Sequence, residues 1–160
     1  MSSTKPFAGV TVLDFSRVLA GPFCTAMLAD LGAEIIKVEP PTGDDQRSMG
    51  AFSQGISVSF ELINRNKRSI RLDLKSEEGR AIARRLAARS DVVVENFRPG
   101  VASKLGIDAE TLRGERADLI YCSISGFGQD GPLARAPSYD VVAQALSGLM
   151  SITGEPDGEP

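Results

Sequence analysis

The sequence predicts an α/β protein built on an open, mainly parallel, Rossmann-like sheet with helices on both faces. Short runs of Val, Ile and Leu alternate along the chain with segments in which apolar residues recur at helical spacing. Such strand, helix, strand units build parallel sheets. With 42% hydrophobic and 24% charged residues, the 160-residue chain has the composition of a globular domain.

The first unit covers residues 10–38. Residues 10–15 read as a strand, and residues 23–31 carry apolar side chains at helical spacing. Pro22 is compatible with a helix start, where no amide donor is lost, and Gly32 ends the helix. A second strand is expected at 34–38, followed by a long loop at 40–55 that is rich in Pro, Gly, Asp and Ser.

The remaining elements follow the same alternation. Strands are expected at 69–74, 91–95 and 119–124, and helices at 77–89, 102–105, 109–113 and 139–150. Ser76 is the expected N-cap of the helix over 77–89, and Ile82 and Leu86 its buried stripe. The polar end at 154–160 reads as a turn, frayed over 155–160.

Charge and residue content exclude several kinds of function. A net charge of −3 and a pI near 5.1 argue against general nucleic-acid binding. The chain has no histidine, which removes histidine triads, histidine-ligated zinc and imidazole bases. There is no apolar run of membrane-spanning length and no signal-like start, and Cys24 and Cys122 lie in apolar segments. We therefore expect a cytoplasmic protein without metal or membrane attachment, with both cysteines in the core.

One stretch concentrates positive charge. Between Asn64 and Lys75 the only acid is Asp73, and the five cations are Arg65, Lys67, Arg68, Arg71 and Lys75. This pattern is compatible with a solvated basic face and also with a phosphate-binding site.

The run from Gly126 to Gly131 satisfies the glycine pattern of dinucleotide-binding turns and follows a predicted strand. In such a turn the glycines open a helix, whereas here residues 132–137 contain two prolines and intervene before the next helical pattern. A nicotinamide site is therefore the weaker interpretation, and a glycine-containing turn is the stronger one.

Four blocks together resemble the amino-terminal part of class III coenzyme A transferases, the carnitine dehydratase and bile acid inducible type. In order along the chain they are Val12–Pro22, Asn64–Lys75, Glu95–Gly100 and Ser123–Gly128. The resemblance extends from about Phe7 to Gly154, and it implies that residues 1–160 form the amino-terminal coenzyme A-binding α/β lobe of an incomplete family fold.

The resemblance also implies which residues bind coenzyme A, although plain core packing or solvent exposure is the alternative for several of them. The implied contacts are Leu19, Ala20, Leu72, Lys75, Asn96, Phe97, Arg98, Lys104 and Tyr139. Pro40 stands where relatives carry a nucleotide-binding arginine, so Arg47 or a neighbour is expected to supply that contact. Leu19 replaces the glutamine of formyl-coenzyme A transferases, which favours an acceptor bulkier or less polar than oxalate.

The chemistry that the family implies is transfer of coenzyme A from an acyl-CoA donor to a free carboxylic acid through an aspartyl-CoA thioester. The nucleophilic aspartate is expected beyond Pro160, so no catalytic residue is assigned within the chain, and an interlocked homodimer is the implied assembly. A carboxylate nucleophile needs no imidazole base, which fits a chain without histidine.

Two alternatives remain open at this point. The chain could be a catalytically inactive coenzyme A-binding lobe or an assembly partner. The related 2-methylacyl-CoA racemases place a histidine and an aspartate where this chain has Tyr139 and Asp140, so a tuned base is lacking and racemization is disfavoured. Asp140 itself is expected to be a helix cap or a first-turn acid.

Overall fold

The computed structural model describes residues 5–155 and residue 158. The chain divides into two compact units, of which the first extends to Ile124 and the second begins at Ser125. Each unit is described by itself below. That the two belong to a single lobe stays a prediction.

The first unit is built on a five-stranded parallel sheet with the strand order β5-β2-β1-β6-β7. The strands are β1 (Thr11–Asp14), β2 (Glu34–Glu39), β5 (Lys67–Arg71), β6 (Val92–Glu95) and β7 (Ile120–Ser123). Leu13 of β1 lies opposite both Ile36 of β2 and Val93 of β6. The α/β class and the open parallel sheet predicted from the sequence are thereby confirmed.

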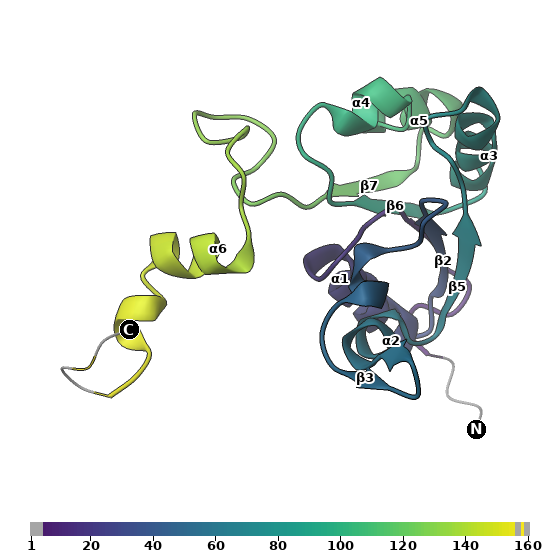
Figure 1. Cartoon of the computed structure of the whole chain (residues 1–160). Helices are drawn as coiled ribbons and strands as arrows, with labels where there is room; N and C mark the ends of the chain where they lie inside the picture. The colour runs from purple at the N-terminus through teal and green to yellow at the C-terminus, as the bar shows by residue number, and fades with distance from the viewer. Residues whose placement is uncertain (1–4, 156–157, 159–160) are drawn as a thin grey trace. The chain divides into compact units, whose positions relative to one another are not determined.

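Helices cover both faces of this sheet (Figure 1). On one face lies α1 (Ala20–Asp30), where Val12, Ile35 and Val94 from three adjacent strands form a small apolar cluster with Ala29 and Ala33. Pro22 occupies the first turn of α1, whose amides have no acceptor within the helix, so the helix begins three residues earlier than position 23.

The opposite face carries the larger apolar core. It is covered by α3 (Glu77–Ala87), α4 (Val101–Leu105) and α5 (Ala109–Glu115). The buried members of this core are Leu13, Phe15, Val38, Leu72, Ala83, Ala87, Val93, Ile107, Leu112 and Leu119. Ser76 caps α3 as predicted, because its hydroxyl accepts a hydrogen bond from the amide of Gly79 at 3.0 Å.

Short elements interrupt the long loop predicted over 40–55. It contains a 3-10 helix, η1 (Asp45–Ser48), and the strand β3 (Phe52–Ser53), which forms a hairpin with β4 (Ile56–Ser57) just before the unpredicted helix α2 (Val58–Asn64). These elements are very short, and the polar residues that read as a loop act as caps: Asp44 begins η1 and Ser57 begins α2.

Two smaller predictions also need correction. The β5 strand lies at Lys67–Arg71 rather than at 69–74, because its pairing with β2 begins at Lys67 opposite Ile35. Ile82 is 38% exposed, and the buried stripe of α3 is instead formed by Gly79, Ala83 and Ala87, with Leu86 half-buried. Small residues at these positions let α3 lie close to the sheet.

Both cysteines, Cys24 and Cys122, are free and half-buried rather than fully buried, and burial raises the pKa of both thiols. No helix within residues 5–155 combines the length and the apolarity needed to cross a bilayer.

The second unit contains α6 (Asp140–Ser147) and a 3-10 turn, η2 (Met150–Ile152). The helix predicted over 139–150 thus ends at Gly148, whose left-handed conformation (φ 79°) terminates it. The frayed end predicted over 155–160 falls largely outside the described residues.

Candidate functional site

The predicted site residues of the first unit lie after the carboxyl ends of parallel strands, except Lys104, which lies in α4. Leu19 and Ala20 follow β1, Leu72 and Lys75 follow β5, and the segment 96–98 follows β6. Since β1 and β6 are neighbours in the sheet, the first and third groups are adjacent, whereas β2 separates β5 from β1. The carboxyl edge of an open parallel sheet is where ligands bind in this class of fold.

Asn96 joins the two adjacent loops directly. Its Oδ1 accepts a hydrogen bond from the amide of Arg17 and its Nδ2 donates to the carbonyl of Arg17, both at 2.8 Å. The guanidinium of Arg17 in turn lies 5.9 Å from the ring centre of Phe97. Asn96 therefore uses its side-chain amide to brace the loop after β1.

Gly21 is required at the same junction. A Cβ atom at this position would lie 2.2 Å from Cβ of Ser16, well inside van der Waals contact. The first turn of α1 can thus approach the loop after β1 closely. The N-cap position of α1 is Leu19, and no side chain caps this end of the helix.

The predicted contacts differ in accessibility. Leu19 is 51% exposed, and Ala20, Lys75, Arg98 and Lys104 are also exposed. Phe97 is half-buried against the larger core. Leu72 is only 8% exposed and belongs to that core, so its side chain packs as the alternative interpretation expected.

The basic stretch from Asn64 to Lys75 is largely neutralised within the protein. Arg65 pairs with Asp30, Arg68 with Glu34, and Lys67 with Asp14 at 3.2 Å. Arg71 donates to the carbonyl of Pro41 at 3.4 Å and pairs with no acid among the described residues, and Lys75 is exposed. If the stretch binds a phosphate, Arg71 and Lys75 are the cations left to do so.

An ionic network that we did not predict lies on the α1 face of the sheet, and all its members except Arg47 are shielded from solvent. It consists of Asp14, Lys37, Glu39, Asp44, Arg47 and Lys67, three acids and three bases. Lys37 is 1% exposed and its Nζ lies 2.7 Å from Oδ2 of Asp44. Opposite charges at such distances compensate one another for the loss of water.

Glu39 is the most strongly held acid of this network. Burial opposes its ionisation, but hydrogen bonds from Arg47, Ser69 and the amide of Asp44 outweigh it and lower the pKa of Glu39 to about 2. The Arg47 guanidinium binds the carboxylate at two points, at 2.7 and 2.6 Å, and lies 3.9 Å from the ring centre of Phe60. Arg47 is thus committed to Glu39, which weakens its case as the replacement for the arginine that relatives carry at position 40.

Lys67 is the base of this network whose pKa is shifted most. Burial lowers the pKa of Lys67 to about 8, and the charge of Asp14 opposes this shift only in part. Its Nζ also donates to the carbonyl of Pro22 at 2.8 Å and to Asn64 at 3.1 Å. The sequence signal that could have revealed the network is the presence of charged residues at alternate positions of otherwise apolar strands.

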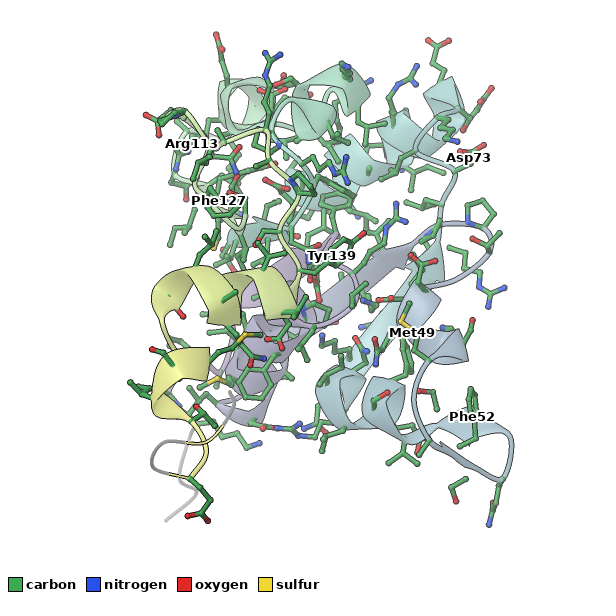
Figure 2. The ribbon with its side chains drawn as sticks, turned by 60° about the vertical axis from the view of Figure 1, so that its left-hand side comes forward. Met49, Phe52, Asp73, Arg113, Phe127 and Tyr139 are labelled. Carbon is green, nitrogen blue, oxygen red and sulfur yellow. The ribbon has the colours of Figure 1, made fainter. Side chains whose placement is uncertain are left out.

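The second unit contains the glycine run and Tyr139. No helix follows the glycines until Asp140, so the turn does not have the geometry of a dinucleotide fingerprint. Tyr139 stands at the start of α6 and is 72% exposed (Figure 2). Asp140 is an acid in the first turn of α6, which is one of the two roles predicted for it, and it accepts a hydrogen bond from Gln144.

No group of three or more residues with metal-ligating side chains was found in the part of the chain that the structure describes. The carboxylates of the ionic network each form an ion pair with Lys37, Arg47 or Lys67.

Comparison with known proteins gives one family. The model of CoA-transferase family III matches residues 7–160. The acetyl-CoA:oxalate CoA-transferase of Acetobacter aceti is 51% identical over 97% of this chain, and the human succinyl-CoA:glutarate CoA-transferase is 49% identical over 100% of it. The chain spans only 40% and 37% of these two relatives.

Solved structures agree. A CAIB/BAIF family protein from Brucella suis superposes with a TM-score of 0.93 at 47% identity, covering 98% of this chain and 43% of its own. Rv3272 from Mycobacterium tuberculosis gives a TM-score of 0.89 at 39% identity, with coverage of 98% and 44%. The chain belongs to CoA-transferase family III, as its four sequence blocks predicted.

Proposed function

We propose that this chain binds the coenzyme A moiety of an acyl-CoA, which a class III transferase passes from the acyl donor to a free carboxylic acid. The observation that carries the proposal is the family match over residues 7–160, combined with the gathering of predicted contacts at the carboxyl edge of the sheet. Both enzymatic relatives described above are named for transfer of coenzyme A.

Each predicted contact then has a part to play. Lys75 and Lys104, both exposed, supply positive charge for the phosphates. Leu19, Ala20, Phe97 and Arg98 contact coenzyme A beside the loop that Asn96 braces. Leu72 contributes through the position of its backbone after β5, and Tyr139 stays a predicted contact on the second unit.

The proposed reaction uses a carboxylate nucleophile expected beyond Pro160. The aspartate attacks the thioester carbonyl, and the C–S bond breaks to release the coenzyme A thiolate and leave a mixed anhydride. The thiolate then attacks the aspartyl carbonyl, which releases the donor acid and forms the aspartyl-CoA thioester. The acceptor carboxylate opens this thioester by the reverse sequence, so no imidazole base is needed.

The acceptor acid follows less directly from the chain. Leu19 favours an acceptor that is bulkier or less polar than oxalate, yet relatives at 51% and 49% identity are named for oxalate and for glutarate. A homodimer and a cytoplasmic location are further predictions. An inactive coenzyme A-binding lobe is the alternative function, and coenzyme A transfer by the purified chain would exclude it.

Calorimetric titration of the chain with coenzyme A, and separately with NAD, tests the ligand. We expect coenzyme A to bind more tightly, and Lys75→Met or Lys104→Met to weaken binding about fivefold each, as loss of a partly exposed phosphate contact does. Lys5→Met, an exposed lysine outside the predicted site, is the matched control and should bind like the wild type. Tighter binding of NAD would overturn the assignment.

Activity needs its own assay. Coenzyme A transfer from an acyl-CoA to succinate, glutarate or oxalate is followed by separation of the products. No transfer by the 160-residue chain is expected if the nucleophile lies beyond Pro160. Transfer by the purified chain would place the nucleophile within it.

A further inference from the structure

The backbone of residues 16–18 is held almost entirely by side chains from other parts of the chain. The amide of Ser16 donates to Asp14 at 2.9 Å, and its carbonyl accepts from Nζ of Lys37 at 2.9 Å. Both backbone groups of Arg17 bind Asn96. The amide of Val18 donates to Oδ1 of Asp44 at 3.3 Å. Five backbone groups of three consecutive residues are thus satisfied by four side chains.

The conformation that these contacts hold is unfavourable. Val18 has a φ of 64°, in the left-handed region that β-branched residues rarely adopt. Such a conformation persists where the surroundings over-determine it, and it is found preferentially at functional sites. Val18 is 39% exposed, so packing of its own side chain does not explain the conformation.

Two of the side chains that hold the segment are themselves fixed by burial. The carboxylate of Asp44 is fully buried, and the Lys37 side chain is 1% exposed. Lys37 therefore contacts the segment after β1 through Ser16 and the segment after β2 through Asp44. Asn96 holds the same three residues from the side of β6.

We propose that Lys37, Asp44 and Asn96 are positioning residues, which keep residues 16–18 in the strained conformation that presents Leu19 and Ala20 to coenzyme A. This inference rests on the proposed function for its ligand. Its structural part, that these side chains hold Val18 in the left-handed region against its own preference, stands on the contacts alone. Because the segment is already held in the binding conformation, coenzyme A does not lose binding free energy in selecting that conformation.

A double-mutant cycle between Asn96 and Val18 tests the proposal. Asn96→Ala frees Arg17, and Val18 then relaxes out of the left-handed region, so coenzyme A should bind about tenfold more weakly. Glycine adopts that region without strain. In the Val18→Gly background the same Asn96→Ala change should therefore cost about twofold or less.

Gln54 supplies the matched control. It also has a positive φ, of 52°, but lies in the turn between β3 and β4. Gln54→Gly should not rescue Asn96→Ala. Equal losses in the Val18 and Val18→Gly backgrounds, or rescue by Gln54→Gly, would refute the proposal. Asn96→Asp, which keeps the acceptor for the Arg17 amide and loses the donor, provides an intermediate variant if Asn96→Ala does not fold.

A measurement without ligand separates this inference from the proposed function. Amide hydrogen exchange at Val18 should be slow in the wild type, faster in Asn96→Ala, and slowed again when Val18→Gly is added. If exchange follows this order and the wild type binds no coenzyme A, the positioning role stands and the ligand is wrong. Unchanged exchange at position 18 in Asn96→Ala would sink the positioning role whatever the binding result.

Discussion

The two faces of the sheet are formed by alternate residues of the same strands, and they are stabilised differently. One carries the larger apolar core, and the α1 face combines a small apolar cluster with the ionic network. In β1, Leu13 points into the large apolar core, while its neighbour Asp14 belongs to the buried ionic network. In β2, Val38 packs into the apolar core, while Lys37 and Glu39 on either side of it carry charge. The period of two along a strand separates the two sets completely.

The two faces therefore contribute differently: the apolar core mainly stabilises the fold, and the ionic network mainly positions the segments around it. An apolar core stabilises the fold by removing surface from water and is tolerant of small changes in shape. A buried ion pair contributes little net stability over an apolar substitute, but losing one partner is costly. Here the ionic face contacts the segments after β1 and β2, whose placement the candidate site depends on, and the apolar face supports them.

The largest expected effect breaks the ionic face. Lys37→Met leaves the carboxylate of Asp44 buried without its cation and should lower the free energy of unfolding by about 4 kcal/mol. Urea denaturation measures the loss. Adding Asp44→Asn removes the orphaned charge while keeping an acceptor for the Val18 amide, so the double variant should be more stable than Lys37→Met alone. A double variant that loses the sum of both changes would contradict this account.

The next effect breaks the apolar face. Leu13→Ala should lower the free energy of unfolding by about 3 kcal/mol, since it opens a cavity in a core where Leu13 is fully buried. Unlike the contribution of Glu39, this loss should be the same at pH 3 and pH 7. Ile107→Val, a smaller deletion in the same core, should cost about 1 kcal/mol. A loss that changes strongly with pH would show that the faces are not independent.

Lowering the pH tests the contribution of Glu39 to the ionic network. Its folded pKa of about 2 lies below its ordinary value of 4.5, so the unfolded chain takes up a proton first as the pH falls. The stability due to Glu39 is present above pH 4.5 and is lost as the pH falls toward 2. Glu39→Gln should flatten the fall measured by thermal unfolding over this window, whereas Glu110→Gln, at an exposed position of α5, should leave it steep.

The smallest expected effect concerns a helix that covers the apolar face. Ser76→Ala removes the cap of α3 and should cost about 1 kcal/mol in urea denaturation. Ser103→Ala, at an exposed position of α4, should change stability by a few tenths of a kcal/mol at most. Similar losses in the two variants would mean that the cap does not stabilise α3.

Apolar runs explain which elements could be predicted. The strands at 34–38 and 91–95 were found within one residue at each end, because their buried residues are contiguous. β5 was shifted because its charged residues Lys67 and Arg68 do not read as a strand, although Lys67 is buried by pairing with Asp14. The helix α2 has only seven residues, too few to show a helical period.

For the site, the sequence indicated only that several candidate blocks follow strands. The structure adds that β1 and β6 are paired and that Asn96 joins the segments after them through its double contact with Arg17. The partners of Lys37 and Glu39 could not be read from the sequence, because a charge in a strand has no local preference for a particular opposite charge. Those choices are made by tertiary contact alone.

The strand order has a consequence for synthesis of the chain. The central strand β1 pairs with β2 within about 25 residues but with β6 only across a separation of about 80, as the bond from the Thr11 amide to Asp91 illustrates. During translation one hydrogen-bonding edge of β1 therefore stays open until Val92–Glu95 has left the ribosome. Pausing or aggregation of nascent chains should concentrate in that interval, when an apolar edge is exposed and its partner has not yet been made.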